Sequence, residues 1–252
     1  MTDRKNWMLG ISQYRDLNEA FLERCAKNGV ESVEYAYTEN DSDYDKVEQW
    51  SKNTGVRIWS RHLDFIHLSI AHPDKERIIR TMETYRRFIH EAAMTGAKTV
   101  VVHPSSEPIA DCDRELRMSE AIDSFGKLVD FAKPYGITVC CESLPRTCLC
   151  HNSDEALKII NSVDGLKLCF DTNHLLTEDP VHFIQKTGKH IHTLHVSDYD
   201  FVDEKHWLPL EGKVDWKSLI AELEKADYNG PFHYECGSPE VIRENRDKLY
   251  SL

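Results

Sequence analysis

The sequence predicts an α/β protein that folds as one (β/α)8 barrel, or TIM barrel, over residues 1–252. Short β-rich runs alternate with helical patterns eight times, and the 252 residues are close to the ~250 that such a barrel uses. No low-complexity segment or Pro/Gly/Ser-rich linker divides the chain. An open doubly wound sheet is the alternative, but the first turn reads GISQY at residues 10–14 and lacks the GxGxxG pattern of a dinucleotide-binding sheet.

The predicted strands are short runs of apolar and β-branched residues, as expected of a parallel sheet that is covered on both faces. They are residues 7–11, 32–36, 56–59, 99–103, 137–141, 166–171, 190–196 and 232–235. Between them, apolar residues recur every three or four positions, which predicts amphipathic helices. The helices are predicted over residues 17–27, 44–52, 75–94, 114–132, 154–161, 180–186, 216–225 and 239–249.

Three helix starts in the C-terminal half carry a local signal. Ser153 and Asp215 each precede a predicted helix, and their side chains can accept a hydrogen bond from a free backbone N–H of the first turn. Pro180 stands in the first turn of its helix, a position that favours proline. These residues are therefore predicted to set the helix boundaries there.

The charge balance excludes several classes of partner. The chain carries 31 basic and 43 acidic residues, a formal net charge of −12. Binding to nucleic acid or to an anionic membrane draws mainly on Lys and Arg, so we expect neither partner. No stretch approaches the ~20 apolar residues that cross a bilayer, and the first ten residues, MTDRKNWMLG, carry charge where a signal peptide is apolar. We therefore expect a cytoplasmic protein.

The eight cysteines are interpreted as free thiols. Cys140, Cys141, Cys169 and Cys236 lie in apolar, strand-like runs, where a free cysteine behaves as a small hydrophobic residue. The CLCH stretch at residues 148–151 has no second pair at the spacing of a structural zinc site. Disulfides and a zinc–thiolate site are therefore not expected.

Reactive side chains gather at the carboxyl ends of the predicted strands, where the active sites of parallel barrels lie. They are Glu34, Arg61, His62, His103, Glu142, Asp171, His174, His195, Asp198 and Glu235. Carboxylates at one rim repel one another, and a divalent metal ion relieves that repulsion. The mixed oxygen and nitrogen donors suit Mn²⁺, Co²⁺, Mg²⁺ or Zn²⁺. Neither a GxSxG elbow nor a P-loop is present in the sequence.

Six stretches occur in an order that resembles one superfamily of barrels. They are VVHP (101–104), CESLPR (141–146), FDTNH (170–174), LHVSD (194–198), LPLEGKVDW (208–216) and YEC (234–236). Together they resemble the xylose-isomerase-like TIM barrels, a superfamily of sugar isomerases and epimerases, over nearly the whole chain. The resemblance to ketose 3-epimerases implies one divalent metal ion, a glutamate acid/base pair formed by Glu142 and Glu235, and four metal ligands, which are Glu142, Asp171, His195 and Glu235.

Other residues are candidates for substrate binding. The resemblance implies this role for His174, and His62, His103, Arg146 and His206 are further candidates because their N–H groups can bind sugar hydroxyls. Arg146 could also bind a phosphate. Two aromatic residues, Trp7 and Trp59, are candidates for an apolar wall against a sugar face.

The chain departs from the epimerase pattern at two places. The loop at residues 209–212 reads PLEG where the family has Pro-Gly-x-Gly, so Leu210 replaces a glycine. Leucine adopts a positive φ only at a cost, and a different loop shape is therefore expected. Phe201 stands six residues after His195, where the epimerases have an arginine that binds substrate.

The expected function is a metal-dependent sugar isomerase or epimerase that acts through a metal-stabilised enediolate on a small sugar or cyclitol. An inositol-type dehydratase and a non-enzymatic metal sensor are alternatives on the same barrel. A third is a metal-dependent phosphodiesterase like endonuclease IV, a three-zinc enzyme, in which His62, His103 and His174 would be extra ligands. Its later ligand pair, Asp-x-His, is replaced here by Glu204-Lys205-His206. Because related barrels often pair, a homodimer is a further expectation.

Overall fold

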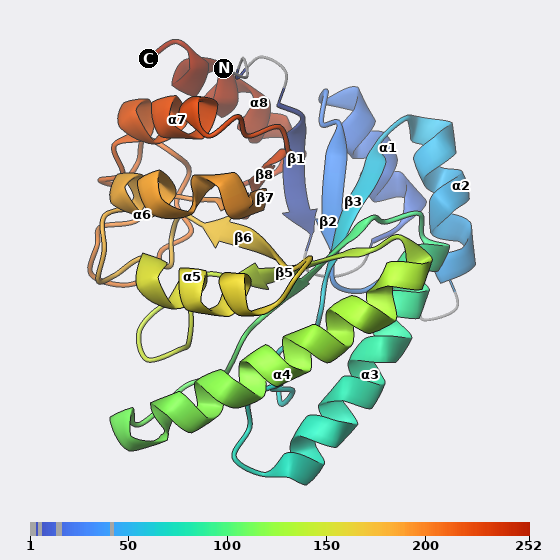
Figure 1. Cartoon of the computed structure of the whole chain (residues 1–252). Coiled ribbons are helices and arrows are strands. Elements are labelled where there is room, and N and C mark those ends of the chain that lie inside the picture. The colour runs from blue at the N-terminus through green and yellow to red at the C-terminus, as the bar shows by residue number, and fades with distance from the viewer. Residues whose placement is uncertain (1–3, 5–6, 14–16, 41–42) are drawn as a thin grey trace.

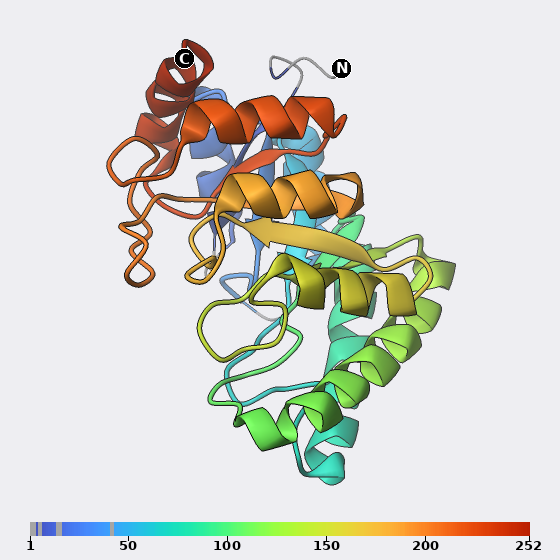
Figure 2. The same cartoon turned by 60° about the vertical axis from the view of Figure 1, so that its left-hand side comes forward.

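The computed structural model describes residue 4 and residues 7–13, 17–40 and 43–252. Within these residues, eight parallel strands pair in chain order and close into a barrel, with β1 bonded to both β2 and β8. Helices surround the barrel in Figure 1, and the long helices α3 and α4 lie side by side in both Figure 1 and Figure 2. The predicted (β/α)8 barrel is confirmed. The charged positions 1–3 and 5–6, and Tyr14 of the first turn, lie outside the described residues.

The strands of the barrel are four to six residues long, except for the shorter β8. They are β1 (Leu9–Gln13), β2 (Ser32–Tyr35), β3 (Arg57–His62), β4 (Thr99–Val102), β5 (Thr138–Glu142), β6 (Lys167–Asp171), β7 (Ile191–Val196) and β8 (Phe232–Tyr234). The α-helices that follow them are α1 (Glu19–Lys27), α2 (Tyr44–Thr54), α3 (Lys75–Met94), α4 (Arg114–Ala132), α5 (Ser153–Ser162), α6 (Pro180–Thr187), α7 (Trp216–Lys225) and α8 (Pro239–Tyr250).

The start of the barrel differs from the prediction. Strand β1 begins at Leu9, two residues later than predicted, and Trp7 precedes it. Trp7 is buried where the strands begin, stacked on Phe232 and edge-on to Tyr228, and its Nε1 donates to the Tyr228 carbonyl at 2.7 Å. The apolar run at 7–11 therefore contains a core residue that lies outside the strand, and the interpretation of Trp7 as a wall for substrate is wrong.

Capping side chains mark the starts of α5 and α7. Asp215 caps α7 as predicted, accepting from the Ser218 N–H at 3.1 Å. The prediction for α5 is wrong by one residue, because Asn152 is its cap and accepts from the Glu155 N–H. Ser153 instead belongs to the helix and donates both its N–H and its hydroxyl to Glu178. Asn152, whose side chain can also accept from a first-turn N–H, therefore caps the helix in place of Ser153.

The space inside the barrel holds polar as well as apolar side chains. Ser32 and His233 are buried there and hydrogen-bonded at 3.0 Å. Gly10 makes room for this pair, because a Cβ at Gly10 would lie 1.8 Å from the His233 ring. Nearer the carboxyl ends of the strands, Glu34 and His195 are also completely buried. Such groups are stable inside a protein only when they are paired, so the barrel interior forms a polar floor beneath the rim.

The eight cysteines are free thiols in the structure, and those of β5 and β6 are buried as predicted. None of the helices in the described residues combines the length and the apolar character needed to span a membrane.

Candidate metal centre and pocket

A cavity of about 530 Å³ opens at the carboxyl ends of the strands. Its volume lies within the range of small-molecule sites. The residues that line it come from the ends of β3, β4, β5 and β8 and from the loops after β3 to β7. They are His62, Phe65, His103, Ser105, Ser106, Glu107, Glu142, Leu144, Pro145, Arg146, Cys148, His174, Glu204, His206 and Glu235.

The four predicted metal ligands converge at this cavity. Glu142 and Asp171 end strands β5 and β6, His195 lies one residue before the end of β7, and Glu235 follows β8 directly. One donor atom of each residue lies within 4.8 Å of the donor atoms of the other three. The parallel pairing explains the convergence, because Asp171 is the register partner of His195 in the neighbouring strand. This set can hold a divalent metal ion.

The imidazole of His195 presents its Nδ1 atom to the carboxylates. Nδ1 lies 3.0 Å from Glu142 Oε1, 3.7 Å from Glu235 Oε1 and 3.8 Å from Asp171 Oδ2. The other ring nitrogen, Nε2, lies 2.7 Å from Glu34 Oε1 inside the barrel. His195 therefore joins the polar floor to the carboxylates above it.

Two carboxylate oxygens of this group show that the residues fit a cation. Asp171 Oδ2 and Glu235 Oε2 are buried and accept no hydrogen bond from any residue that the structure describes. Burial, together with the nearby charge of Glu142, raises the pKa of Asp171 to about 7. Burial and the charge of Asp171 raise the pKa of Glu235 to about 8. A divalent cation would supply the positive charge that these oxygens lack.

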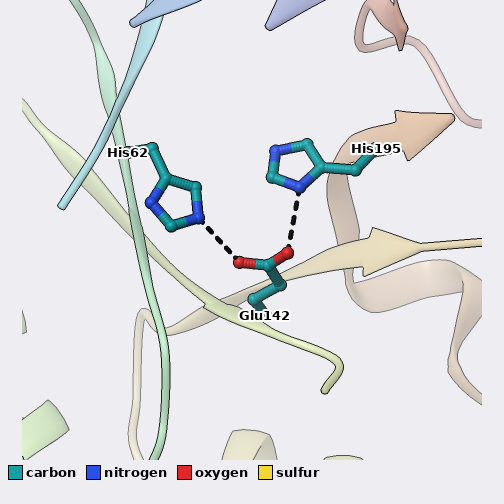
Figure 3. A group of neighbouring side chains, drawn as sticks. All are labelled: His62, Glu142 and His195. Atoms are coloured by element: carbon teal, nitrogen blue, oxygen red, sulfur yellow. Dashed lines mark hydrogen bonds and ion pairs between the residues drawn. The ribbon is translucent and has the colours of Figure 1, made fainter. Parts of the chain in front are cut away.

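Glu142 differs from the other carboxylates because histidines surround it. Its Oε2 lies 3.0 Å from Nε2 of His62 and 3.0 Å from Nε2 of His103, and its Oε1 lies 3.0 Å from Nδ1 of His195. Figure 3 shows His62 and His195 approaching Glu142 from two sides. Burial would raise the pKa of Glu142, but His195 and His103 hold it well below its usual range. Glu142 is therefore ionised.

The remaining predicted substrate residues also line the cavity. His174 Nδ1 donates to the Ser143 carbonyl at 2.8 Å, and its Nε2 lies 3.7 Å from Glu204 Oε2. Together with His206, these side chains place one donor atom each within 4.8 Å of the others. The structure thus forms a second His/Glu cluster, nearer to solvent than the first.

Arg146 lies at the rim and is paired with acidic residues. Its guanidinium lies 2.8 Å from Glu107, 2.8 Å from Asp203 and 2.5 Å from Glu204. These partners come from the loops after β4 and β7, so Arg146 ties two loops together at the mouth of the cavity. With three carboxylates around it, the guanidinium carries no excess positive charge toward a phosphate.

Three of the residues considered for the site do not line the cavity. Arg61 is buried behind the barrel, where it contacts the rings of Tyr44 and Phe88 and pairs with Glu91 at 2.8 Å. Trp59 stacks on His192 and does not line the cavity, so its interpretation as a substrate wall is wrong.

Asp198 is the third of these residues, and it organises the loop after β7. Its carboxylate accepts from the backbone N–H groups of Tyr199, Leu210 and Val214 and from the indole of Trp216. Leu210 holds φ +78°, so it adopts the left-handed conformation that glycine would adopt more easily.

Several residues of the site were not singled out from the sequence. Phe65 stacks on His103 with ring centres 4.1 Å apart, and Glu107 and Glu204 face the cavity from loops. Nothing in a loop sequence marks such residues. Glu34 did carry a signal, since it is a charged residue within a predicted apolar strand.

Comparison with known proteins agrees with this geometry. The chain matches the family model described as xylose isomerase-like TIM barrel over residues 22–252. It belongs to the xylose isomerase-like TIM-barrel family. The family resemblance predicted from the six sequence stretches is thereby confirmed.

Individual proteins resemble this chain at low sequence identity. The uncharacterized protein MJ1311 of Methanocaldococcus jannaschii is 27% identical over 205 residues, which cover 73% of this chain and 68% of MJ1311. A D-tagatose 3-epimerase-like protein of known structure has a TM-score of 0.86 at 21% identity and covers 97% of both chains. The IOLI protein, solved with a zinc atom, has a TM-score of 0.78 at 18% identity and covers 96% of both chains. At these identities, the two structural likenesses establish the fold.

Proposed function

We propose that this barrel is a divalent-metal-dependent sugar isomerase or epimerase. The proposal rests on the convergence of Glu142, Asp171, His195 and Glu235 at one end of the barrel, with buried oxygens of Asp171 and Glu235 that lack hydrogen-bond donors. These four residues would hold the ion. When bound, a divalent ion supplies Lewis-acid stabilisation of the negative charge that develops next to a sugar carbonyl. Mn²⁺, Co²⁺, Mg²⁺ and Zn²⁺ all suit this donor set.

The proposed acid/base pair is Glu142 and Glu235, and their surroundings assign the two roles. Three histidines keep Glu142 ionised, so it is the group able to take a proton from the carbon beside the carbonyl. In the metal-free protein, burial and the charge of Asp171 raise the pKa of Glu235 to about 8, so Glu235 is the more basic carboxylate of the pair. Environments that push two pKa values apart are typical of acid/base pairs. Strands β5 and β8 are not neighbours in the barrel, so the two glutamates would act on different faces of the substrate.

The proposed substrate is a small sugar or cyclitol, without a phosphate group. His103, His174 and His206 line the cavity with ring nitrogens that would bind hydroxyl groups. His62 also lines it, but its two ring nitrogens already contact the Leu63 carbonyl and Glu142. The guanidinium of Arg146 is already paired with three carboxylates, which favours a hydroxyl over a phosphate at the rim. The cytoplasmic location and the homodimer remain proposals, and light scattering after size-exclusion chromatography tests the latter.

A second candidate function is a metal-dependent phosphodiesterase of the endonuclease IV kind. The observation that favours it is the presence of further metal-ligating groups. His62 and His103 both lie 3.0 Å from Glu142 Oε2, and His174, Glu204 and His206 form a cluster of their own. The net charge of −12 disfavours a DNA substrate. A dehydratase would use the first site alone and would differ from an isomerase in its product.

Metal content distinguishes these candidates. Elemental mass spectrometry of the purified protein should find about one divalent ion per chain, and the double variant Glu142→Gln/Glu235→Gln should lose it. Two or three zinc ions per chain would favour the phosphodiesterase. No bound metal under any loading condition would refute the proposed chemistry.

A sugar screen then tests the reaction itself. The metal-loaded protein is incubated with ketoses and inososes in D₂O and followed by proton NMR. An epimerase or isomerase should exchange the C–H beside the carbonyl for deuterium and form a product of equal mass apart from the label. Loss of water from the substrate would instead identify a dehydratase.

A further inference from the structure

We propose that Glu34 is a positioning residue that fixes the orientation and tautomer of His195 for metal binding. The inference rests on the proposed metal site and adds a residue that does not touch the ion or the substrate. Glu34 lies on β2, three strands around the barrel from β7, and it is completely buried. Its effect on the site can therefore pass only through its neighbours.

The contact that carries the inference is between Glu34 and the ring of His195. Glu34 Oε1 lies 2.7 Å from His195 Nε2, the nitrogen on the far side of the ring from the proposed ligands. The near-side nitrogen, Nδ1, faces Glu142, Asp171 and Glu235 at distances of 3.0–3.8 Å. One imidazole thus bridges a buried carboxylate and the proposed metal position.

Glu34 is itself held in place by two hydroxyl groups. Ser60 of β3 donates to Oε2 at 2.6 Å, and Ser12 of β1 donates to Oε1 at 3.1 Å. Both carboxylate oxygens are therefore engaged, and the side chain cannot turn away from His195 without losing a hydrogen bond. The carboxylate is fixed by strands β1 to β3, while the ring that it contacts belongs to β7.

The chemistry of this contact determines which nitrogen binds the metal. Glu34 and Nε2 of His195 form a 2.7 Å ion pair and not a regular hydrogen bond. An ionised carboxylate has no proton to donate, so a contact this close requires a proton on Nε2. A neutral imidazole with its proton on Nε2 has its lone pair on Nδ1, directed at the proposed metal position. A carboxylate behind a ligating histidine also makes the ring a stronger donor, and loss of such a partner typically lowers metal affinity ~10- to 100-fold.

A purely structural role explains the arrangement less well. Burying a carboxylate inside a barrel is costly. A neutral side chain at position 34, such as an amide or a hydroxyl, could also hydrogen-bond to Ser12 and Ser60 and join β1, β2 and β3 without that cost. The additional feature of Glu34 is its negative charge against His195. That charge matters to the ligand nitrogen and not to the pairing of the strands.

The test compares metal affinity in matched variants of the full-length protein. Glu34→Gln keeps the shape of the side chain and removes its charge. Glu34→Asp keeps the charge and withdraws it from His195 by one methylene. Ser32→Ala is the control, because it removes a buried hydrogen bond of the barrel interior, to His233, without touching Glu34 or His195. Dissociation constants for Zn²⁺ are measured by chelator competition, and the Co²⁺ form is examined by absorption spectroscopy.

We expect both Glu34 variants to bind Zn²⁺ ~10- to 100-fold more weakly than wild type and to shift the Co²⁺ bands. Ser32→Ala should change the melting temperature but neither the affinity nor the spectrum. Unchanged affinity and Co²⁺ bands in folded Glu34→Gln would overturn the inference. A wild-type protein that binds no metal would instead refute the proposed function on which the inference depends.

Discussion

Metal affinity should depend steeply on pH, because the proposed ligands hold protons in the metal-free protein. Burial raises the pKa of Asp171 to about 7 and that of Glu235 to about 8. A metal ion that uses both carboxylates must displace these protons. Its apparent affinity is therefore the intrinsic affinity multiplied by the fraction of molecules in which both groups are ionised. Lowering the pH from 8 to 6 is therefore the perturbation of interest.

The size of the effect follows from the two pKa values. Both carboxylates are ionised in about half of the molecules at pH 8, but in only about one in a thousand at pH 6. Affinity should thus fall roughly 500-fold between these pH values, which corresponds to about 3.7 kcal/mol. The surrounding carboxylates also raise the pKa of His195 despite its burial, so its proton adds to the effect and the figure is a lower bound.

Isothermal titration calorimetry measures both the affinity and the protons released. Titrations at pH 6 and pH 8, each in two buffers of different ionisation enthalpy, should give at least about two protons released per ion at the lower pH. Asp171→Asn removes one titrating group, so its proton release at pH 6 should fall by about one. An affinity that changes less than about tenfold between the two pH values would refute the reasoning, because it would mean that the carboxylates are already ionised before the metal binds.

Four further measurements test other parts of the structure. Leu210→Gly should raise the free energy of unfolding by about 0.5–1 kcal/mol, because it removes the cost of a left-handed leucine. Little packing is lost, since 45% of Leu210 is exposed. Thermal melts should show a rise of ~1–3 °C, and no rise would mean that the loop adapts to leucine. Asp198→Ala leaves three backbone N–H groups and an indole N–H without their acceptor. It should lower the free energy of unfolding, measured in urea, by ~3–5 kcal/mol. A loss below about 1 kcal/mol would contradict the role of Asp198 in organising the loop. Glu235→Gln should reduce proton exchange on any identified sugar by ~10²–10⁴-fold in the NMR assay, and a variant that keeps most of its rate would remove Glu235 from the acid/base pair. The metal-free protein should lose stability as the pH rises from about 7 to about 9. The folded-state pKa values of Asp171, Glu235 and His62 are about 7, 8 and 9 and exceed the unfolded values, so the folded state binds more protons and is favoured at the lower pH. Melting temperatures that stay level over this range in a chelating buffer would contradict this.

The sequence predicted the fold and the position of the site because both follow from the order of strands and helices. Helices α3 and α4 have the bounds that their apolar periodicity predicts. In a parallel barrel every strand ends at the same rim, so a residue at a strand end is near every other such residue. His62 and Glu142 end their strands and line one cavity for this reason.

Depth within the barrel could not be predicted in the same way. Glu34 and Glu142 are both glutamates in apolar strands, yet one is closed off below the rim and the other lines the cavity. The difference depends on how far each strand is shifted against its neighbours, and this shift belongs to the closed barrel rather than to any one segment. The role of Asp198 could not be predicted for a similar reason. The loop that it organises returns to the end of β7, where Trp207 pairs with Asp198 through backbone hydrogen bonds, and these contacts join residues that are distant in the sequence.

The opposite protonation of Glu142 and Glu235 also belongs to the assembled site. Each is a glutamate that ends a short apolar run, and the sequence gives no reason to distinguish them. His62 from β3 and His103, which follows β4, place two more imidazoles beside Glu142, whereas Glu235 faces the buried carboxylate of Asp171. Histidines predicted as substrate ligands thus have a second effect, since they keep one glutamate ionised while its counterpart keeps a proton. The difference in proton affinity between the two glutamates of the metal-free site therefore comes from these neighbours and not from the glutamates themselves.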